Sequence, residues 1–341
     1  MTPREIVIRT IEFRDPPRIP LAFWNFEIGD ADLSHTPVLA DAVQGAFDDI
    51  HCVSYAAADG GPITRNIEGR GRVDEWGVTW IEGRAANPPI ETWDEWKSYP
   101  FPDAHAPSRF AGVDASINAN RQLYLLGLIW NTTFERMWML RGFENLLVDP
   151  YENRRMFFEL RDRYLEFSLA ILDRWLETEV DSIYYGDDLG TQIGLVMSPE
   201  MWRQLYLPMY RELFGRARAA GKHVFFHSCG DVTPIIPDML DCGLNVLNPV
   251  QPQAMDVRAI LREFGKDLVV WGATDLQNLL SRGTPGDIEK EIEDVVSLCW
   301  RSGGYIGGTA QGSAPGTPLA NIETFCRTFT RLSRAGQPAE S

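Results

Sequence analysis

Residues 223–250 read HVFFHSCGDVTPIIPDMLDCGLNVLNPV, and they contain two short apolar runs on either side of a segment with helical character. The two runs are His223–Cys229 and Asn245–Val250. Apolar residues are nearly continuous in both runs, which is typical of strands that are buried on both faces of a parallel sheet. The stretch therefore predicts one strand–helix–strand unit.

The same pattern recurs on both sides of this stretch. The further apolar runs are Arg18–Phe23, His51–Tyr55, Tyr124–Trp130, Ser182–Asp188, Leu268–Thr274 and Tyr305–Gln311. Eight strands that mostly alternate with helices over roughly 290 residues predict an α/β fold, namely a single (β/α)8 barrel of the TIM type. A doubly wound open sheet is the alternative.

Three of the intervening helices carry clear signals. Apolar residues recur every three or four positions in Asp149–Glu179. Ser198 followed by Pro199 is typical of a helix start, and that helix is predicted to run toward Ala220, with Gly221 as its stop. Residues 284–287 (TPGD) open another helix, which is predicted to end near residue 300.

One region departs from the alternation. Residues 65–84, RNIEGRGRVDEWGVTWIEGR, predict a β-hairpin, and the residues from there to Pro102 predict a loop. We interpret residues 65–102 as an insertion after the second strand. The expected organisation is one barrel domain over residues 1–335, with a frayed tail over residues 336–341.

Composition excludes several function classes. The chain has 341 residues, with 32 Lys and Arg against 48 Asp and Glu, so its net charge is −16. This charge argues against nucleic acid or an anionic membrane as the main partner. No apolar stretch is long enough to span a membrane, and the charged first residues predict no secretory signal. Five cysteines, a sparse and odd number, fit a reducing cytoplasm.

Polar and aromatic residues gather where the predicted strands end, which is where barrels of this type place their active sites. Any one of them can be a cap or turn residue, but nearly every strand contributes. The candidate catalytic residues are Glu135, Asp187 and Asp188. The candidate substrate-binding residues are Trp24, Asn25, Trp130, Tyr185, Asn248, Gln251 and Gln311.

Adjacent residues on an extended chain point to opposite sides. Only one of Asp187 and Asp188 is therefore expected to face the barrel mouth, where it would act as an acid, a base or a metal ligand. The other is expected to cap a helix or to bind a backbone amide.

A candidate metal site follows from the spacing of His227 and Cys229. Two residues apart on a strand, both side chains point to the same side. Imidazole and thiolate together suit zinc. The alternative is a buried core histidine beside an apolar free cysteine, because two ligands do not make a zinc site. The other cysteines are interpreted as packing residues, and they are Cys52, Cys242, Cys299 and Cys326.

Several segments together resemble the uroporphyrinogen decarboxylase superfamily over essentially the whole chain. They are residues 15–20 (DPPRIP), 74–77 (DEWG), 134–136 (FER), 141–146 (RGFENL), 186–190 (GDDLG), 227–230 (HSCG), 248–251 (NPVQ), 303–306 (GGYI) and 317–321 (TPLAN). The resemblance implies the same barrel. It also implies one of two chemistries.

The decarboxylases themselves use no metal and bind the carboxylates of their substrate through N-terminal arginines. Residues 23–30 of this chain, FWNFEIGD, contain no arginine and two acids. A substrate with many carboxylates would be repelled there. The segment therefore argues against uroporphyrinogen as the substrate.

The other branch resembles zinc methyltransferases that move methyl groups between a corrinoid and a thiol or another acceptor. Their zinc motif is His-x-Cys with a distant third cysteine. His227 and Cys229 match the first two positions, and Gln311 falls at the third. Glutamine is a weak ligand for zinc, which leaves three alternatives. Either a carboxylate such as Glu135, Asp187 or Asp188 is the third ligand, or the metal is weakly held, or it is absent.

The expected function is a zinc-assisted methyltransferase that acts on a small molecule together with a corrinoid carried by a partner protein. A metal-independent decarboxylase of a smaller acid is the alternative. A non-catalytic protein that binds a tetrapyrrole or corrinoid is the second alternative. Whether the chain forms a homodimer stays open.

Overall fold

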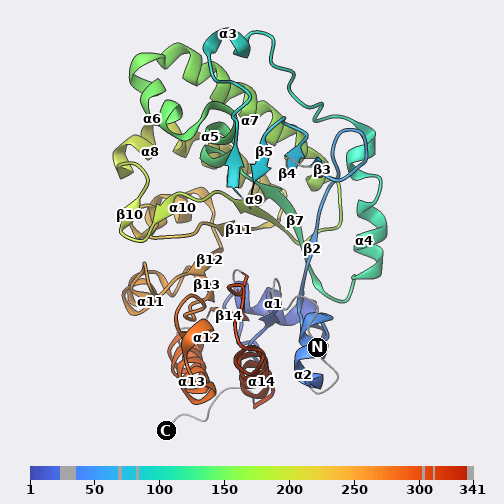
Figure 1. Cartoon of the computed structure of the whole chain (residues 1–341). Coiled ribbons are helices and arrows are strands. Elements are labelled where there is room, and N and C mark those ends of the chain that lie inside the picture. Colours follow the sequence, from blue (N-terminus) through green and yellow to red (C-terminus); the bar gives the residue numbers. More distant parts are fainter. Residues whose placement is uncertain (24–35, 68–70, 82–83, 302–303, 310–311, 336–341) are drawn as a thin grey trace.

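The computed structural model describes residues 1–23, 36–67, 71–81, 84–301, 304–309 and 312–335. Eight parallel strands form one sheet, and their order around it follows the chain (Figure 1). They are β1 (Leu21–Ala22), β2 (Ile50–Val53), β7 (Tyr124–Trp130), β8 (Ser182–Gly186), β11 (His223–His227), β12 (Val246–Val250), β13 (Val269–Gly272) and β14 (Tyr305–Gly308). The predicted barrel and its eight strands are confirmed.

The sheet closes between its first two strands. The backbone N–H of Asp49, directly before β2, donates to the carbonyl of Leu21 in β1 at 2.8 Å. The guanidinium of Arg18 also binds the Asp49 carboxylate at 2.6 Å. These contacts join the edges of the sheet into a ring.

Helices surround the ring. They include α2 (Pro37–Val43), α4 (Val113–Ala119), α7 (Arg154–Leu176), α9 (Leu207–Ala219), α10 (Ile236–Cys242), α11 (Val257–Phe264), α13 (Pro285–Arg301) and α14 (Leu319–Ala335). Figure 1 shows α13 and α14 side by side, in agreement with the contacts between them. Further elements are α3 (Trp93–Trp96), α5 (Phe134–Arg141), α6 (Phe143–Glu152), α8 (Pro199–Leu205), α12 (Leu279–Arg282), the 3-10 turns Pro107–Phe110 and Thr233–Ile235, and strands β9 (Gly190–Thr191) and β10 (Gly194–Leu195).

The core has two parts, because successive residues of a strand point to opposite faces. Tyr184 belongs to the smaller cluster inside the ring, whereas Tyr185 belongs to the larger cluster between sheet and helices. Helix α1 (Pro3–Ile11) adds Val7 and Ile11 to the inner cluster. Helix α1 therefore closes the end of the barrel that lies opposite the carboxyl ends of the strands.

The helix predictions hold with two corrections. The predicted helical segment Asp149–Glu179 contains the end of α6 and the whole of α7, which are separated at Asn153.

Ser198 caps α8 as expected, since its hydroxyl accepts from the backbone N–H of Met201 at 3.1 Å. The predicted single helix toward Ala220 is two helices, α8 and α9, separated at Tyr206. Pro208 explains the break, because it lacks the N–H that a continuous helix needs.

The insertion is larger than the predicted hairpin. It is a four-stranded antiparallel sheet of β3 (Thr64–Ile67), β4 (Gly71–Asp74), β5 (Thr79–Ile81) and β6 (Arg84–Ala86). A tight turn joins β4 to β5. Gly77 has φ +78° there, and the Asp74 carboxylate accepts from the backbone N–H groups of Trp76 and Val78 at 3.0 Å each. The four strands reverse the chain three times, whereas the predicted hairpin has one reversal.

Candidate metal centre and its cavity

Three side chains with metal-binding groups meet where β8 and β11 end. The ligand atoms of Asp188, His227 and Cys229 all lie within 4.8 Å of one another. His227 Nε2 is 3.6 Å from Cys229 Sγ and 3.6 Å from Asp188 Oδ1. The predicted pair of His227 and Cys229 is therefore joined by one of the carboxylates that the sequence offered.

The parallel register brings these residues together. His227 pairs with Gly186 of β8 on one side and with Asn248 of β12 on the other. The loop that carries Cys229 is then held by Asp188, whose Oδ1 accepts from the backbone N–H of Cys229 at 2.8 Å.

Two glycines allow the chain to cross over itself at this loop. Gly230 has φ +79°, and a Cβ added there would lie 2.3 Å from the carbonyl carbon of Gly190. A Cβ on Gly190 would in turn lie 2.6 Å from the carbonyl oxygen of Cys229. Contacts this short are not tolerated, so the start of β9 can rest on the Cys229 loop only because both residues lack a side chain.

The orientation of His227 is set by its neighbours inside the barrel. Its Nδ1 lies 2.6 Å from Asn248 Oδ1, which also accepts from the Tyr184 hydroxyl at 2.5 Å. Because the amide oxygen can only accept, Nδ1 carries the proton and Nε2 presents a lone pair to the cluster. Histidine ligands of metals are typically held in this way.

The charges of the cluster favour a bound cation. Burial raises the pKa of the Cys229 thiol, and the nearby carboxylates of Asp188 and Glu135 raise it further. A divalent cation reverses this, because a coordinating thiol loses its proton. One sulfur, one nitrogen and one oxygen donor form a set that zinc accepts, and three protein ligands leave a fourth position open. The residues present therefore fit zinc.

Glu135 lies beside this cluster, at the second position of α5. Burial raises the pKa of its carboxyl well above the usual range, and the charges of Asp188 and Asp187 add to the effect. The amide of Asn131 donates to Glu135 Oε2 at 3.3 Å. The structure thus places Glu135 as the sequence predicts, near the mouth of the barrel.

Asp187 points the other way and is buried. Its carboxylate accepts from the backbone N–H groups of Phe134 and Glu135 at 3.0 and 2.7 Å, and from the hydroxyl of Tyr210 at 2.5 Å. Burial raises its pKa, which these hydrogen bonds oppose. Asp187 therefore anchors the start of α5, and of the two adjacent acids it is the one that binds backbone amides, as expected for one of them. Its place among the candidate catalytic residues is not supported by this orientation.

The predicted substrate-binding residues separate into groups. Trp130 is 40% exposed, and its ring centre is 5.4 Å from that of His227. Asn248 orients His227, and Gln251 accepts from the backbone N–H of Gly230 at 2.6 Å, so both support the metal-binding loop. Tyr185 does not reach the site, because its hydroxyl donates to the carbonyl of Leu213 outside the sheet. Trp24, Asn25 and Gln311 lie outside the described residues.

A cavity of about 390 Å³ adjoins the cluster. The strand ends and the inserted sheet line it together, and its lining residues are Tyr55, Ile63, Thr64, Asp74, Glu75, Trp76, Trp80, Trp130, Asn131, Glu135, Arg136, Tyr164, Phe167, Asp188 and His227. Two features were not predicted from the sequence: the role of Tyr184 beside His227, and the contribution of the insertion to the cavity wall. Strand alternation could have identified Tyr184, which shares the inner face with His227.

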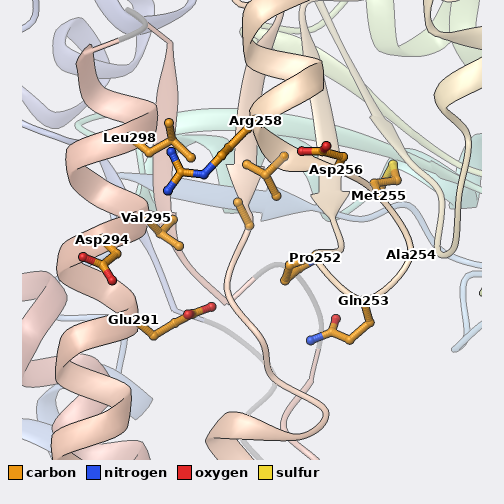
Figure 2. Close-up of a pocket in the computed structure, with 12 residues that line it drawn as sticks. Pro252, Gln253, Ala254, Met255, Asp256, Arg258, Glu291, Asp294, Val295 and Leu298 are labelled. Atoms are coloured by element: carbon orange, nitrogen blue, oxygen red, sulfur yellow. The ribbon is translucent and has the colours of Figure 1, made fainter.

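A second cavity of about 580 Å³ lies between α11 and α13. Figure 2 shows Glu291 of α13 and Gln253 of the loop after β12 pointing into this space. None of the three cluster residues lines it. The larger cavity is therefore separate from the candidate centre.

The remaining cysteines lie apart from the cluster. Cys242, Cys299 and Cys326 are buried and Cys52 is half-buried. Burial raises the pKa of Cys242 to about 11 and of Cys299 to about 12. This agrees with their interpretation as packing residues.

Comparison with known families adds to this geometry. The family model of uroporphyrinogen decarboxylase (URO-D) matches residues 85–332. The chain belongs to this family.

Two curated relatives of this family member are methyltransferases. One is a methylated-thiol–coenzyme M methyltransferase of Methanosarcina mazei, 27% identical over 39% of this chain and 33% of that protein. The other is the methylcobamide:CoM methyltransferase MtaA of Methanosarcina barkeri, 27% identical over 50% of this chain and 47% of that protein. The matched segments thus span between a third and a half of these relatives.

A solved structure, described as a methyltransferase from Methanosarcina mazei, resembles this URO-D family member over 97% of this chain and 99% of that one. The TM-score is 0.67 at 15% identity, which supports the barrel fold. Within the described residues of the chain, no helix is long and apolar enough to cross a membrane.

Proposed function

We propose that this URO-D family member is a zinc-assisted methyltransferase, which moves a methyl group between a corrinoid and a small thiol or another small substrate. The observation that carries the proposal is the meeting of Asp188, His227 and Cys229 beside a cavity. The two curated relatives named as methyltransferases support the reaction class.

We assign separate roles in metal binding and substrate binding to the residues of the site. Asp188 takes the third ligand position, His227 is aligned by Asn248, and Cys229 is held by the backbone contact to Asp188. Zinc bound there would supply a Lewis acid that lowers the pKa of a thiol or polarises an ether oxygen. Glu135 and Trp130 line the cavity in which the small substrate would lie.

The corrinoid would reach the site on a separate protein. Trp130 is exposed at the strand ends, next to His227, and so offers an apolar contact at the mouth. We place the protein in the cytoplasm, since none of the five cysteines, all of them within the described residues, forms a disulfide.

Decarboxylation of a polycarboxylate fits the cavity less well. Among the described lining residues, Arg136 is the one arginine or lysine, and it already binds Asp74 at 2.5 Å. No unpaired cation of this lining would neutralise several carboxylates.

Zinc analysis of protein prepared without added metal tests the proposal. We expect close to one zinc per chain in the wild type and a large loss in His227→Ala. His223→Ala is the matched control, because His223 begins the same strand and bonds the Tyr124 hydroxyl instead. Equally low zinc in the wild type and His227→Ala would refute the metal centre.

A further inference from the structure

We propose that Trp130 is a specificity-determining residue of the cavity beside the candidate metal centre, and that it selects small molecules that carry an aromatic ring. This inference rests on the proposed function for its reaction, and it adds the structural class of the small substrate. Three features support it: the place of the indole on the sheet, its contacts with neighbouring rings, and the composition of the cavity wall.

Gly186 creates the space that the Trp130 indole occupies. It pairs with Trp130 of β7 on one side and with His227 of β11 on the other. A Cβ added to Gly186 would lie 1.9 Å from Cε3 and 2.1 Å from Cζ3 of Trp130. The six-membered part of the indole therefore stands where a side chain of residue 186 would be, and glycine within a strand often marks such a close approach. The missing side chain brings the indole next to His227.

Two neighbouring rings hold the indole in this position. The ring centre of Trp130 is 5.2 Å from that of Tyr184 at an interplanar angle of 61°, and 5.4 Å from that of His227 at 80°. Both are edge-to-face arrangements, which aromatic side chains favour. Tyr184 and His227 are in turn fixed by hydrogen bonds to Asn248. The indole is therefore placed before a ligand arrives, and it is still 40% exposed.

The cavity wall is aromatic rather than aliphatic. Among the described residues that line the cavity, Ile63 is the one aliphatic hydrophobic side chain. Six others carry an indole, phenol or phenyl ring, and they are Tyr55, Trp76, Trp80, Trp130, Tyr164 and Phe167. Trp76 packs edge-on against Tyr164 and Phe167, with ring centres 5.4 and 4.6 Å apart. Since pairs of aromatic rings gain more than the burial of their area provides, the wall favours an aromatic ring over a saturated ring of the same size.

The size of the cavity suits a single ring. Its volume of about 390 Å³ lies near the lower end of the range of about 300–1,000 Å³ that is common for small-molecule sites. This space accommodates a substituted benzene ring but not a tetrapyrrole macrocycle. The ligand of the cavity is therefore the small substrate, and a corrinoid would stay at the mouth.

A matched pair of ethers tests the inference. Methoxybenzene and methoxycyclohexane are uncharged and have the same number of non-hydrogen atoms, and they differ in whether the ring is aromatic. Their dissociation constants are measured on the full chain as purified, by ligand-observed NMR titration, and again after treatment with a chelator. We expect methoxybenzene to bind at least about threefold more tightly to the wild type in both preparations.

Substitution of two tryptophans shows whether Trp130 is responsible. We expect Trp130→Leu to reduce the ratio of the two dissociation constants at least about twofold, because one aromatic contact is lost. Trp130→Phe keeps a ring and should keep most of the preference. Trp138→Leu is the matched control and should leave the ratio unchanged, since Trp138 of α5 packs 6.0 Å from the Phe143 ring centre and does not line the cavity.

Gly186→Ala tests the position of the indole without removing it. The new Cβ takes the space in which the six-membered ring lies, so the indole has to move. We expect a loss of preference similar to that in Trp130→Leu. Circular dichroism checks that the variant is folded, and Trp130→Leu decides alone if it is not.

The outcomes separate this inference from the metal centre. Low zinc in the wild type would refute the metal centre, while the titrations on chelator-treated protein would still measure the ring preference. Equal binding of the two ethers, or no detectable binding of either, would overturn the inference. A ratio that stays unchanged in Trp130→Leu, or that falls equally in Trp138→Leu, would also overturn it.

Discussion

His227 depends on two side chains that do not themselves belong to the metal cluster. Asn248 Oδ1 receives hydrogen bonds from His227 Nδ1 and from the Tyr184 hydroxyl, at 2.6 and 2.5 Å. The amide oxygen fixes the tautomer of His227, and the hydroxyl fixes the amide. The lone pair of Nε2 is therefore aimed before any metal arrives, which reduces the entropy that binding costs.

Removing this support should weaken metal binding without removing a ligand. We expect Asn248→Ala to lower zinc affinity by roughly 10- to 100-fold, the range typical for such outer partners. The measurement is a competition titration against a chromogenic chelator. Asn248→Asp keeps an acceptor oxygen and should bind zinc at least as tightly as the wild type. Unchanged affinity in Asn248→Ala would contradict the orienting role.

At the residue scale, the sequence predicted members of the candidate metal cluster better than the residues that support them. His227 and Cys229 share a strand, so their common side follows from spacing alone. Asn248 and Tyr184 lie on neighbouring strands, and their contact with His227 depends on inter-strand register, which spacing within one strand does not determine. Asn248 was predicted as a substrate contact for that reason.

Among the elements, α5 connects the barrel to the candidate metal centre. Asp187 binds the first backbone N–H groups of α5, and Glu135 and Arg136 extend from the same turn toward the cavity. The two adjacent acids thus have separate tasks: Asp187 positions the helix and Asp188 faces the cluster.

Substitution of the two acids should separate these tasks. We expect Asp187→Ala to lower the free energy of unfolding by at least about 2 kcal/mol, because buried donors lose their acceptor. Asp188→Ala should cost less stability than Asp187→Ala, because the Asp188 side chain is partly exposed and accepts one backbone hydrogen bond, from Cys229, but it should lose zinc. Urea denaturation and zinc analysis on both variants provide the measurement. Equal destabilisation by the two variants would show that Asp188 is structural as well.

The insertion marks the limit of prediction for elements. Its turns resemble those of a simple hairpin, so the pattern predicts two strands where the structure has four. Two ion pairs, Asp74–Arg136 and Glu75–Arg109, attach the insertion to the barrel. Their partners are separated by 62 and 34 positions in the chain, respectively. Such long-range pairs decide that the insertion forms a cavity wall, and no local pattern encodes them.

For the whole molecule, the barrel was predictable because every strand is a separate apolar run and the runs pair in chain order. Parallel strands with helical crossovers have few alternatives once eight such units follow one another. The cavity was not predictable, since it arises where the strand ends meet the insertion.

Metal binding at the strand ends of β8 and β11 should stabilise the entire fold. Free zinc at a hundredfold excess over its dissociation constant adds about 2.7 kcal/mol to the free energy of unfolding. We expect a chelator to lower the melting temperature of the wild type by a few degrees and to leave His227→Ala unaffected. Thermal denaturation with and without chelator measures this. The same shift in both proteins would point to a metal bound elsewhere.

The crossing of β9 over the Cys229 loop has an evolutionary consequence. The backbone at Gly190 leaves no room for a side chain on Gly230, and the backbone at Gly230 leaves none for a side chain on Gly190. A single substitution at either position would therefore displace the backbone that carries Cys229. We expect the two positions to have been inherited as a linked pair. A lineage that abandons the metal is free to lose both, and the two glycines would then disappear together with the cysteine between them in the chain.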